Sequence, residues 1–145
     1  MRTKRKLLAA GLVFVAVAAA FVFGQVDVAT KSIHFDLRTI GQSIYEARST
    51  IGRWPAEIED LEGTAYLRMP YRKTMLEDGV FVVMWQQDLD PDPQANRNRV
   101  LAYDNGSLFS RLGWIWVCRG DLRIERMGAR QLAELTGRPR QAGKR

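Results

Sequence analysis

Residues 7–24 read LLAAGLVFVAVAAAFVFG, eighteen consecutive positions that carry no charge. Four basic residues precede this stretch within positions 2–6, and Asp27 is the first acidic residue of the chain. A helix of this length spans about 27 Å, or about 30 Å with Gln25 and Val26 included, which matches the hydrocarbon thickness of a bilayer. The sequence therefore predicts a transmembrane anchor over residues 7–26.

The charges that flank this anchor predict its orientation. A basic cluster stays on the cytoplasmic side of a membrane. We therefore expect residues 1–6 to form a cytoplasmic basic end and everything after residue 26 to be exported. The expected localisation is the inner (cytoplasmic) membrane, crossed by a single pass with the N-terminus inside.

The same stretch also fits a cleaved secretory signal. Residues 18–20 are all alanine, as a small-x-small cleavage site after an apolar run requires. Cleavage there would release a small periplasmic or secreted binding module that starts near Phe21. Retention is favoured because the apolar run continues through residues 21–23, and both alternatives export the rest of the chain.

A helical stripe follows the anchor. Apolar residues recur at intervals of three and four, with polar residues between them: Ile33, Leu37, Ile40, Ile44, Ala47 and Ile51. This spacing predicts an amphipathic helix that packs on a sheet or on a neighbouring helix. The helix is expected to end at Gly52, with Pro55 just beyond it, and to bend at Gly24 and Gly41 if it continues the anchor.

Short runs of β-branched and aromatic residues predict a small sheet in the second half of the chain. We expect strands at residues 80–85, 100–103, 114–118 and 122–127. Turn residues such as Asp104-Asn105-Gly106 and Arg119-Gly120-Asp121 separate the later strands, which indicates an antiparallel sheet.

The remaining segments are assigned from their composition. We expect a short acidic helix at 56–61, irregular chain at 62–78, a polar loop at 86–99 and an amphipathic helix at 129–136. The predicted fold class is α+β: an N-terminal transmembrane helix, extended by an amphipathic helix that packs on a small antiparallel sheet. The exported domain would cover residues 27–137, followed by a disordered basic tail at 138–145.

The distribution of charge argues against nucleic-acid binding. The chain carries 22 basic and 16 acidic residues, a formal net charge of +6. Eight of the basic residues lie in positions 1–6 and 138–145, so residues 7–137 carry a net charge of −2. A surface that tracks phosphates needs its basic residues on a folded face, so we expect no nucleic-acid partner.

Two groups of residues follow the predicted anchor and the amphipathic helix in a recognisable order. Gly52-Arg53-Trp54-Pro55 and the acidic piece Glu57 to Leu61 follow the amphipathic helix. The closing stretch runs from Val100-Leu101-Ala102-Tyr103 through Gly113-Trp114 to Gly120-Asp121-Leu122 and Glu125. This order of parts resembles the type IV pilin-like proteins, and among them the pseudopilins of type II secretion systems.

The resemblance implies a pilin-like fold with a structural or secretion-assembly role, and secretion or pilus assembly proteins as partners. In that family the leader ends in Gly followed by Phe-Thr-Leu-x-Glu, and the Glu helps to align a subunit in the filament. This chain has no such string, and no Asp or Glu lies within residues 7–26. We therefore expect a domain held in the membrane as a monomer or as an unorthodox accessory subunit.

Few residues qualify for catalysis. His34 is the only histidine, which excludes a multi-histidine metal site. Ser107 and Ser110 lack the flanking glycines of a nucleophile elbow. The single Cys118 lies in a predicted strand, where a free cysteine behaves as a small apolar side chain. We predict that the protein is not an enzyme and has no obligatory cofactor.

One loop carries a hypothesis of metal binding. Asp88, Asp90 and Asp92 have the spacing of the first three ligands of an EF-hand, a calcium-binding loop. Pro93 stands where that loop needs Gly, and Arg99 where it needs the closing Glu. The alternatives are a calcium site, which the pseudopilin resemblance supports, and a solvated acidic loop, which we favour.

The helical stripe is the other candidate site. Five of its residues would form either the core of the exported domain or a surface between subunits: Ile33, Leu37, Ile40, Ile44 and Ile51. Pilin filaments bury such stripes against one another. Because the anchor lacks the family's Glu, we expect most of this stripe to be intramolecular core.

Overall fold

The computed structural model describes residues 2–137, and side chains from Val15 onward. The predicted basic tail at 138–145 lies outside the described residues. The chain divides into two units, Met1–Ser32 and Ile33–Arg145. Helix α1 (Arg2–Ile51) forms the described part of the first unit and is also the first element of the second unit. We call the second unit the domain.

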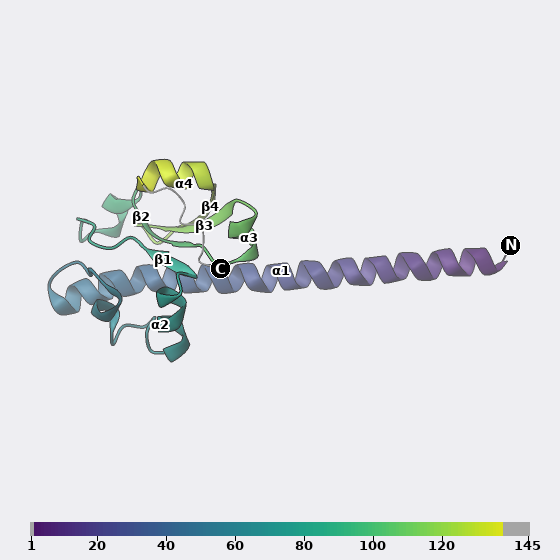
Figure 1. The fold of residues 1–145 in the computed structure, drawn as a ribbon, viewed down its shortest axis with the longest axis horizontal. Coiled ribbons are helices and arrows are strands. Elements are labelled where there is room, and N and C mark those ends of the chain that lie inside the picture. Colours follow the sequence, from purple (N-terminus) through teal and green to yellow (C-terminus); the bar gives the residue numbers. More distant parts are fainter. Residues whose placement is uncertain (1, 138–145) are drawn as a thin grey trace. The chain divides into compact units, whose positions relative to one another are not determined.

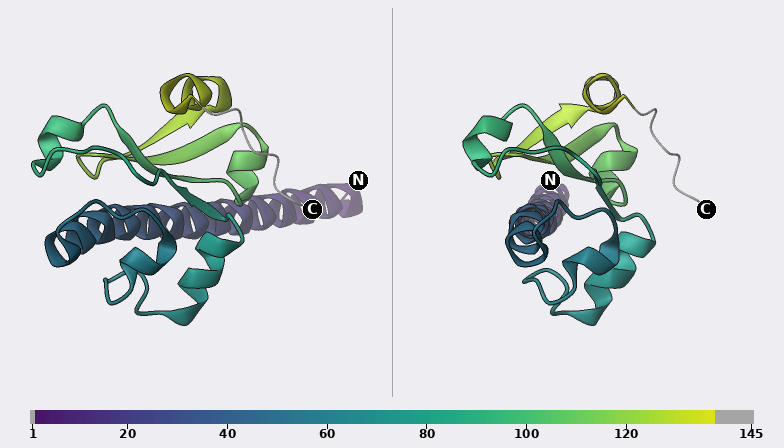
Figure 2. Two further views of the ribbon diagram at one scale, coloured as in Figure 1. Left: turned by 60° about the vertical axis from the view of Figure 1, so that its left-hand side comes forward. Right: turned by 90° about the vertical axis from the view of Figure 1, so that its left-hand side faces the viewer.

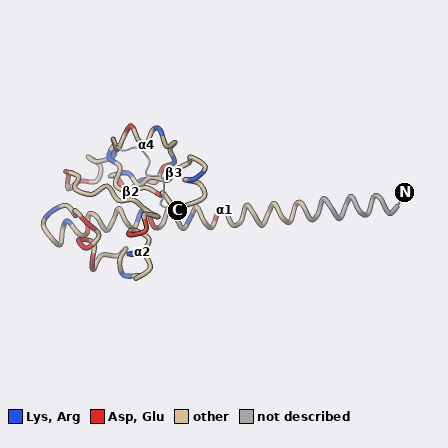
Figure 3. Tube along the Cα trace, viewed as in Figure 1, with Lys and Arg blue, Asp and Glu red and all other residues tan. Residues whose placement is uncertain are grey.

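The first unit is an apolar helical segment. Every side chain described between residues 15 and 29 is exposed, and residues 15–26 carry no charge (Figure 3). The helix is long and apolar enough to cross a membrane, although a signal sequence has the same properties. The structure is thus compatible with both readings of the N-terminal sequence.

The domain is built on a four-stranded antiparallel sheet (Figure 1). Its strands are β1 (Phe81–Val83), β2 (Val100–Asp104), β3 (Trp114–Arg119) and β4 (Ile124–Gly128), in the spatial order β1-β2-β3-β4. Each strand therefore pairs with its neighbour in the chain, as short connections favour. The predicted α+β layout, a long apolar N-terminal helix and a small antiparallel sheet, is confirmed.

Helices cover both faces of this sheet (Figure 2). The domain part of α1 packs on one face, where its stripe joins Phe81, Val83, Leu101 and Cys118 in the main core. Helix α4 (Ala129–Thr136) covers the other face, where Leu132 joins a second core with Ile115, Val117 and Met127. Because both faces are covered, all five residues of the inner strand β2 are buried.

The prediction of irregular chain at 62–78 was wrong, because this stretch contains helix α2 (Pro70–Glu77). Pro70 occupies the start of the helix, where its missing N–H costs nothing. The only buried residues of α2 are Arg72 and Leu76, so the helix has no apolar stripe that a sequence pattern could show.

Other boundaries also differ from the sequence prediction. The acidic helix at 56–61 is a single 3-10 turn, η1 (Ile58–Leu61), and the strand at 80–85 shortens to β1. Two further short helical elements were not predicted: η2 (Pro93–Asn96), in the expected polar loop, and α3 (Leu108–Arg111), in a segment without an assignment. Their side chains cap backbone N–H groups, since Asp92 accepts from Gln94 N and Ser107 accepts from Ser110 N.

Gly41 has a different role from the expected bend. Helix α1 is continuous through Gly24 and Gly41. A Cβ atom at Gly41 would lie 2.8 Å from both Cys118 Sγ and Leu122 Cδ2, whereas one at Gly24 would meet nothing within 4 Å. Gly41 is therefore the point at which the helix backbone comes close to the β3–β4 hairpin.

Gly41→Ala is expected to destabilise the domain by about 1–3 kcal/mol, because the added methyl forces helix and hairpin apart. Urea unfolding of the full chain in detergent, followed by circular dichroism, measures this change. Gly24→Ala is the matched control and should leave the domain transition unchanged. Equal stability of the two variants would contradict the close approach at Gly41.

Candidate functional site

The stripe of α1 lies in the core of the domain. Ile33, Leu37, Ile40 and Ile44 are at most 9% exposed, whereas Ile51, at the end of the helix, is 40% exposed. The structure thus brings four of the five stripe residues together against the sheet and leaves Ile51 outside. Buried side chains have no free surface for a second subunit.

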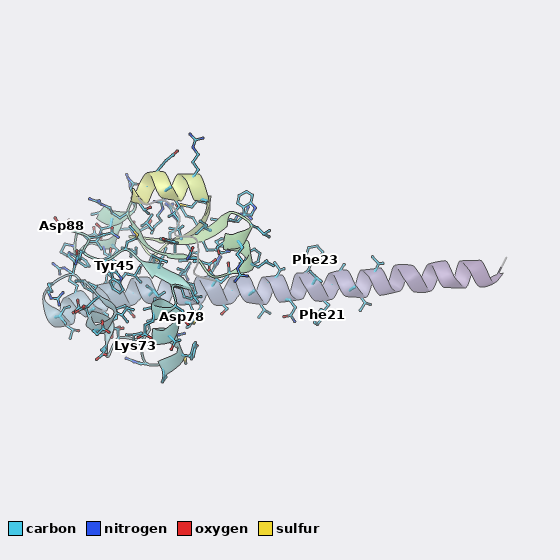
Figure 4. All side chains as sticks on the ribbon, in the orientation of Figure 1. Phe21, Phe23, Tyr45, Lys73, Asp78 and Asp88 are labelled. Carbon is cyan, nitrogen blue, oxygen red and sulfur yellow. The ribbon has the colours of Figure 1, made fainter. Side chains whose placement is uncertain are left out.

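The acidic loop is held together by its own backbone. Asp90 Oδ1 accepts a hydrogen bond from Asp92 N at 2.8 Å, and Asp92 Oδ1 accepts one from Gln94 N at 3.0 Å. These are local turns of a kind that short acidic side chains commonly form. The side chain of Asp88 is exposed at the surface (Figure 4).

Asn96 is the centre of this loop, a role that no motif in the sequence predicts. Its side chain accepts from Asp90 N and donates to the backbone oxygens of Asp90 and Asp92. It also donates to the hydroxyl of Tyr45 on α1, which in turn donates to Gly120 O at 2.8 Å. An isolated Asn in a polar segment shows no pattern from which this role could be predicted.

These bonds bear on the calcium hypothesis. Within residues 15–137, where side chains are described, no group of three or more His, Cys, Asp or Glu is arranged to hold a metal ion. Asp88, Asp90 and Asp92 are therefore not brought together as a ligand set. Calcium binding by this loop stays a prediction, with the capped loop as the alternative that the hydrogen bonds favour.

A buried ion pair joins α1 to α2. Arg72 Nη2 lies 3.2 Å from Asp36 Oδ1, and both side chains are at most 10% exposed. The guanidinium also lies 5.0 Å from the ring centre of Tyr66 and 5.5 Å from that of Phe35. Burial raises the pKa of Asp36, and the charge of Arg72 opposes this shift. The Arg72 guanidinium therefore provides the counter-charge that favours the ionised carboxylate of Asp36 in a buried position.

One signal for this pair was present in the sequence. Asp36 stands three residues after Ile33 and four before Ile40, on the apolar face of the predicted helix. An acidic residue at such a position requires a buried basic partner. The partner itself could not be identified, because Arg72 lies in a stretch without a helical pattern.

His34 on α1 forms an aromatic contact with Trp116 on β3. Their rings meet edge to face with centroids 4.2 Å apart. Neither His34 Nε2 nor Trp116 Nε1 has a hydrogen-bond partner among the described residues. Burial, together with the nearby charge of Arg38, lowers the pKa of His34, so both act against the charged form of the ring.

Cys118 is buried as predicted. It is fully enclosed, beside Gly41, and burial raises the pKa of its thiol to about 12. A thiol in this state is not a nucleophile at neutral pH, because reactivity belongs to the thiolate. Its role in the described structure is to fill the contact between helix and sheet.

Exposed apolar residues gather around α3. Leu108 and Leu112 are 69% and 67% exposed, and Trp114, at the start of β3, is 50% exposed. Two exposed basic residues accompany them, Arg111 on α3 and Arg126 on β4, whose guanidinium lies 4.5 Å from the ring centre of Trp114. We call these five residues the α3 patch. Trp114 thus lies in the strand predicted at 114–118, but half of its surface is exposed.

No protein-family model, curated protein or solved structure matches this chain. The described geometry contains a buried ion pair, a capped acidic loop and an exposed apolar and basic patch. The first two hold elements of the domain in place. The α3 patch is the one whose side chains are available to a partner.

Asp90→Ala should lower the Tm of the full chain by the same amount with and without calcium. The expected cost is about 1 kcal/mol, since the lost hydrogen bond to Asp92 N forms in either condition. Differential scanning calorimetry of the detergent-solubilised protein measures both shifts, with Asp88→Ala as the control. A larger effect of Asp90→Ala in calcium would identify a cation site.

Arg72→Met should lower the free energy of unfolding by about 3–5 kcal/mol, because it leaves the Asp36 carboxylate buried without its counter-charge. The double variant Asp36→Leu with Arg72→Met should lose much less, since neither charge then remains buried. Urea unfolding of the unaltered protein, the single variants Arg72→Met and Asp36→Leu, and the double variant gives the coupling free energy. Additive losses would show that the pair does not act as a unit.

Proposed function

We propose that this chain is a single-pass protein of the cell envelope, with its N-terminus in the cytoplasm and an exported, pilin-like domain. Its role would be structural, or in the assembly of a secretion system or pilus. The inner membrane would be its location, and secretion or pilus assembly proteins its partners. In this proposal the protein is not an enzyme.

The observation that carries this proposal is the continuous passage of α1 from an exposed apolar segment into a buried amphipathic one. Residues 15–29 are exposed, and from Ile33 the stripe is buried against a four-stranded antiparallel sheet. An exposed apolar helix surface is stable only in lipid or against a partner. The order of an apolar helix, an amphipathic helix and a small sheet is the order that resembles the pilin-like proteins.

A non-catalytic role is supported by the state of the reactive side chains. The Cys118 thiol is buried, and its pKa is raised to about 12. His34 lies against Trp116, and its Nε2 has no hydrogen-bond partner among the described residues. The two groups do not form a pair of nucleophile and base, and the raised pKa of the thiol is the opposite of the lowered pKa that activates a nucleophile.

The proposal includes a monomeric state in the membrane. The stripe that would mediate filament packing is occupied by the domain's own sheet, and residues 7–26 contain no acidic residue to align neighbouring subunits. Partners would therefore contact other surfaces. The proposal therefore assigns the protein a role as an unorthodox accessory subunit rather than as an ordinary polymerising one.

The cleaved binding module is the alternative, and N-terminal sequencing of the mature protein distinguishes the two. An intact N-terminus in the membrane fraction supports the anchored protein. A mature chain that begins near Phe21 and is found in the soluble exported fraction supports the binding module. The sheet and its tryptophans would then be the place to search for a ligand.

Ile44→Asp should abolish the cooperative unfolding transition of the domain, because an unpaired charge enters the core at a cost of several kcal/mol. Ile51→Asp is the matched control and should change stability little, since Ile51 is already 40% exposed. Thermal unfolding by circular dichroism and crosslinking in membranes are measured together. If Ile44→Asp keeps its transition but loses self-association, the stripe is an intersubunit surface and the monomer proposal is wrong.

A further inference from the structure

Hydrogen bonds and core packing hold α3, which together with its C-cap Leu112 carries three of the five residues of the α3 patch, against the rest of the domain. The buried Asp104 accepts hydrogen bonds from the backbone N–H and the hydroxyl of Ser107, the residue that caps α3. Phe109 packs against the main core on the inner side of the helix. Leu108 and Leu112, on the outer side of the helix, are therefore held in an exposed position. Their apolar side chains gain no free energy of burial from the domain's own packing.

The direction of β3 shows at which end of the domain this patch lies. Trp116 contacts His34, Cys118 lies beside Gly41, and Gly120 accepts from the hydroxyl of Tyr45. Residue numbers thus increase together along β3 and along α1. Trp114, two residues before Trp116, lies at the end of the domain where Ile33 begins it, and α3 directly precedes Trp114 in the chain.

The connection to the anchor keeps this end near a bilayer. Residues 27–32 are all that separate Val26, the last residue of the predicted anchor, from Ile33. Seven helical steps cover about 10 Å, and even a fully extended connection reaches only about 25 Å. The polar headgroup layer is itself several ångströms thick. The Ile33 end of the domain therefore stays close to the membrane surface.

The chemistry of the patch suits that surface. Tryptophan prefers the interface between headgroups and acyl chains, because its ring is apolar and its indole N–H is polar. Arg111 and Arg126 supply positive charge that anionic headgroups attract. Residues 105–120 contain no acidic side chain that would oppose this attraction.

We propose that the α3 patch is a second membrane contact, which seats the domain on the interface of the bilayer that its own anchor spans. Leu108, Leu112 and Trp114 enter the interfacial layer, while Arg111 and Arg126 bind anionic headgroups. This inference rests on the proposed anchor. A second copy of the chain fits the patch less well, because a symmetric contact would bring the same two arginines of both copies together.

The test uses the full chain reconstituted in vesicles of anionic lipid, part of which is brominated near the headgroup end of its acyl chains. Bromine quenches tryptophan fluorescence only at contact. We expect quenching in the unaltered protein, loss of most of it in Trp114→Phe, and no loss in the control Trp85→Phe, which alters a half-buried tryptophan outside the patch.

A second pair of variants tests the leucines. Leu108→Glu combined with Leu112→Glu should abolish the quenching of Trp114 without changing the thermal transition, because both side chains are exposed. Leu135→Glu, which alters an exposed leucine of α4, should leave the quenching unchanged. Vesicles of zwitterionic lipid should give weaker quenching than anionic ones.

Flotation of the vesicles separates failure of this inference from failure of the proposed function. If the protein floats with the vesicles but Trp114 is not quenched, the anchor stands and the second contact is wrong. If crosslinks between copies then form through Trp114, the patch is an interface between two chains. If the protein does not float at all, the anchored function is wrong, and this inference fails with it.

Discussion

The close contact between α1 and the β3–β4 hairpin is the constraint on which the domain depends. Gly41 leaves room for the Cys118 thiol and for Leu122, so helix and sheet approach more closely than any side chain at position 41 would permit. On either side of it, the stripe from Ile33 to Ala47 is buried. Burial of apolar area at about 25 cal/mol per Å² is the main stabilising term available to so small a domain, and it requires this contact.

Apolar patterns in the sequence predicted the parts of the fold that apolar burial holds in place. The stripe of α1, the strands around Val100 and Trp114, and the helix that ends at Gly137 were all identified. Apolar patterns did not predict the part of the fold in which a buried polar side chain makes the contact. Helix α2 is fixed by Arg72, whose partner lies on α1, and no local periodicity in residues 62–78 reports a contact made with a distant residue.

The acidic loop shows a second limit of sequence reasoning. Spacing showed that three carboxylates lie close together in the chain, but it did not show which of their oxygens already accept hydrogen bonds. In the structure one carboxylate oxygen of Asp90 and one of Asp92 accept hydrogen bonds from backbone N–H groups, and Asn96 organises the loop. A ligand set and a capped loop use the same residue types, so only the geometry distinguishes them.

Because the domain's own sheet occupies the stripe, any partner must contact what remains exposed. On α1 these residues include Phe35, Arg38, Gln42 and Glu46, and around α3 they are the leucines, Trp114 and the two arginines of the patch. The first group is mostly polar and suits a weak, hydrated protein contact. The second is apolar and basic and lies at the end of the domain that Ile33 begins. If this end contacts lipid as proposed, protein partners would have to use the opposite end of the domain, where α1 finishes at Ile51.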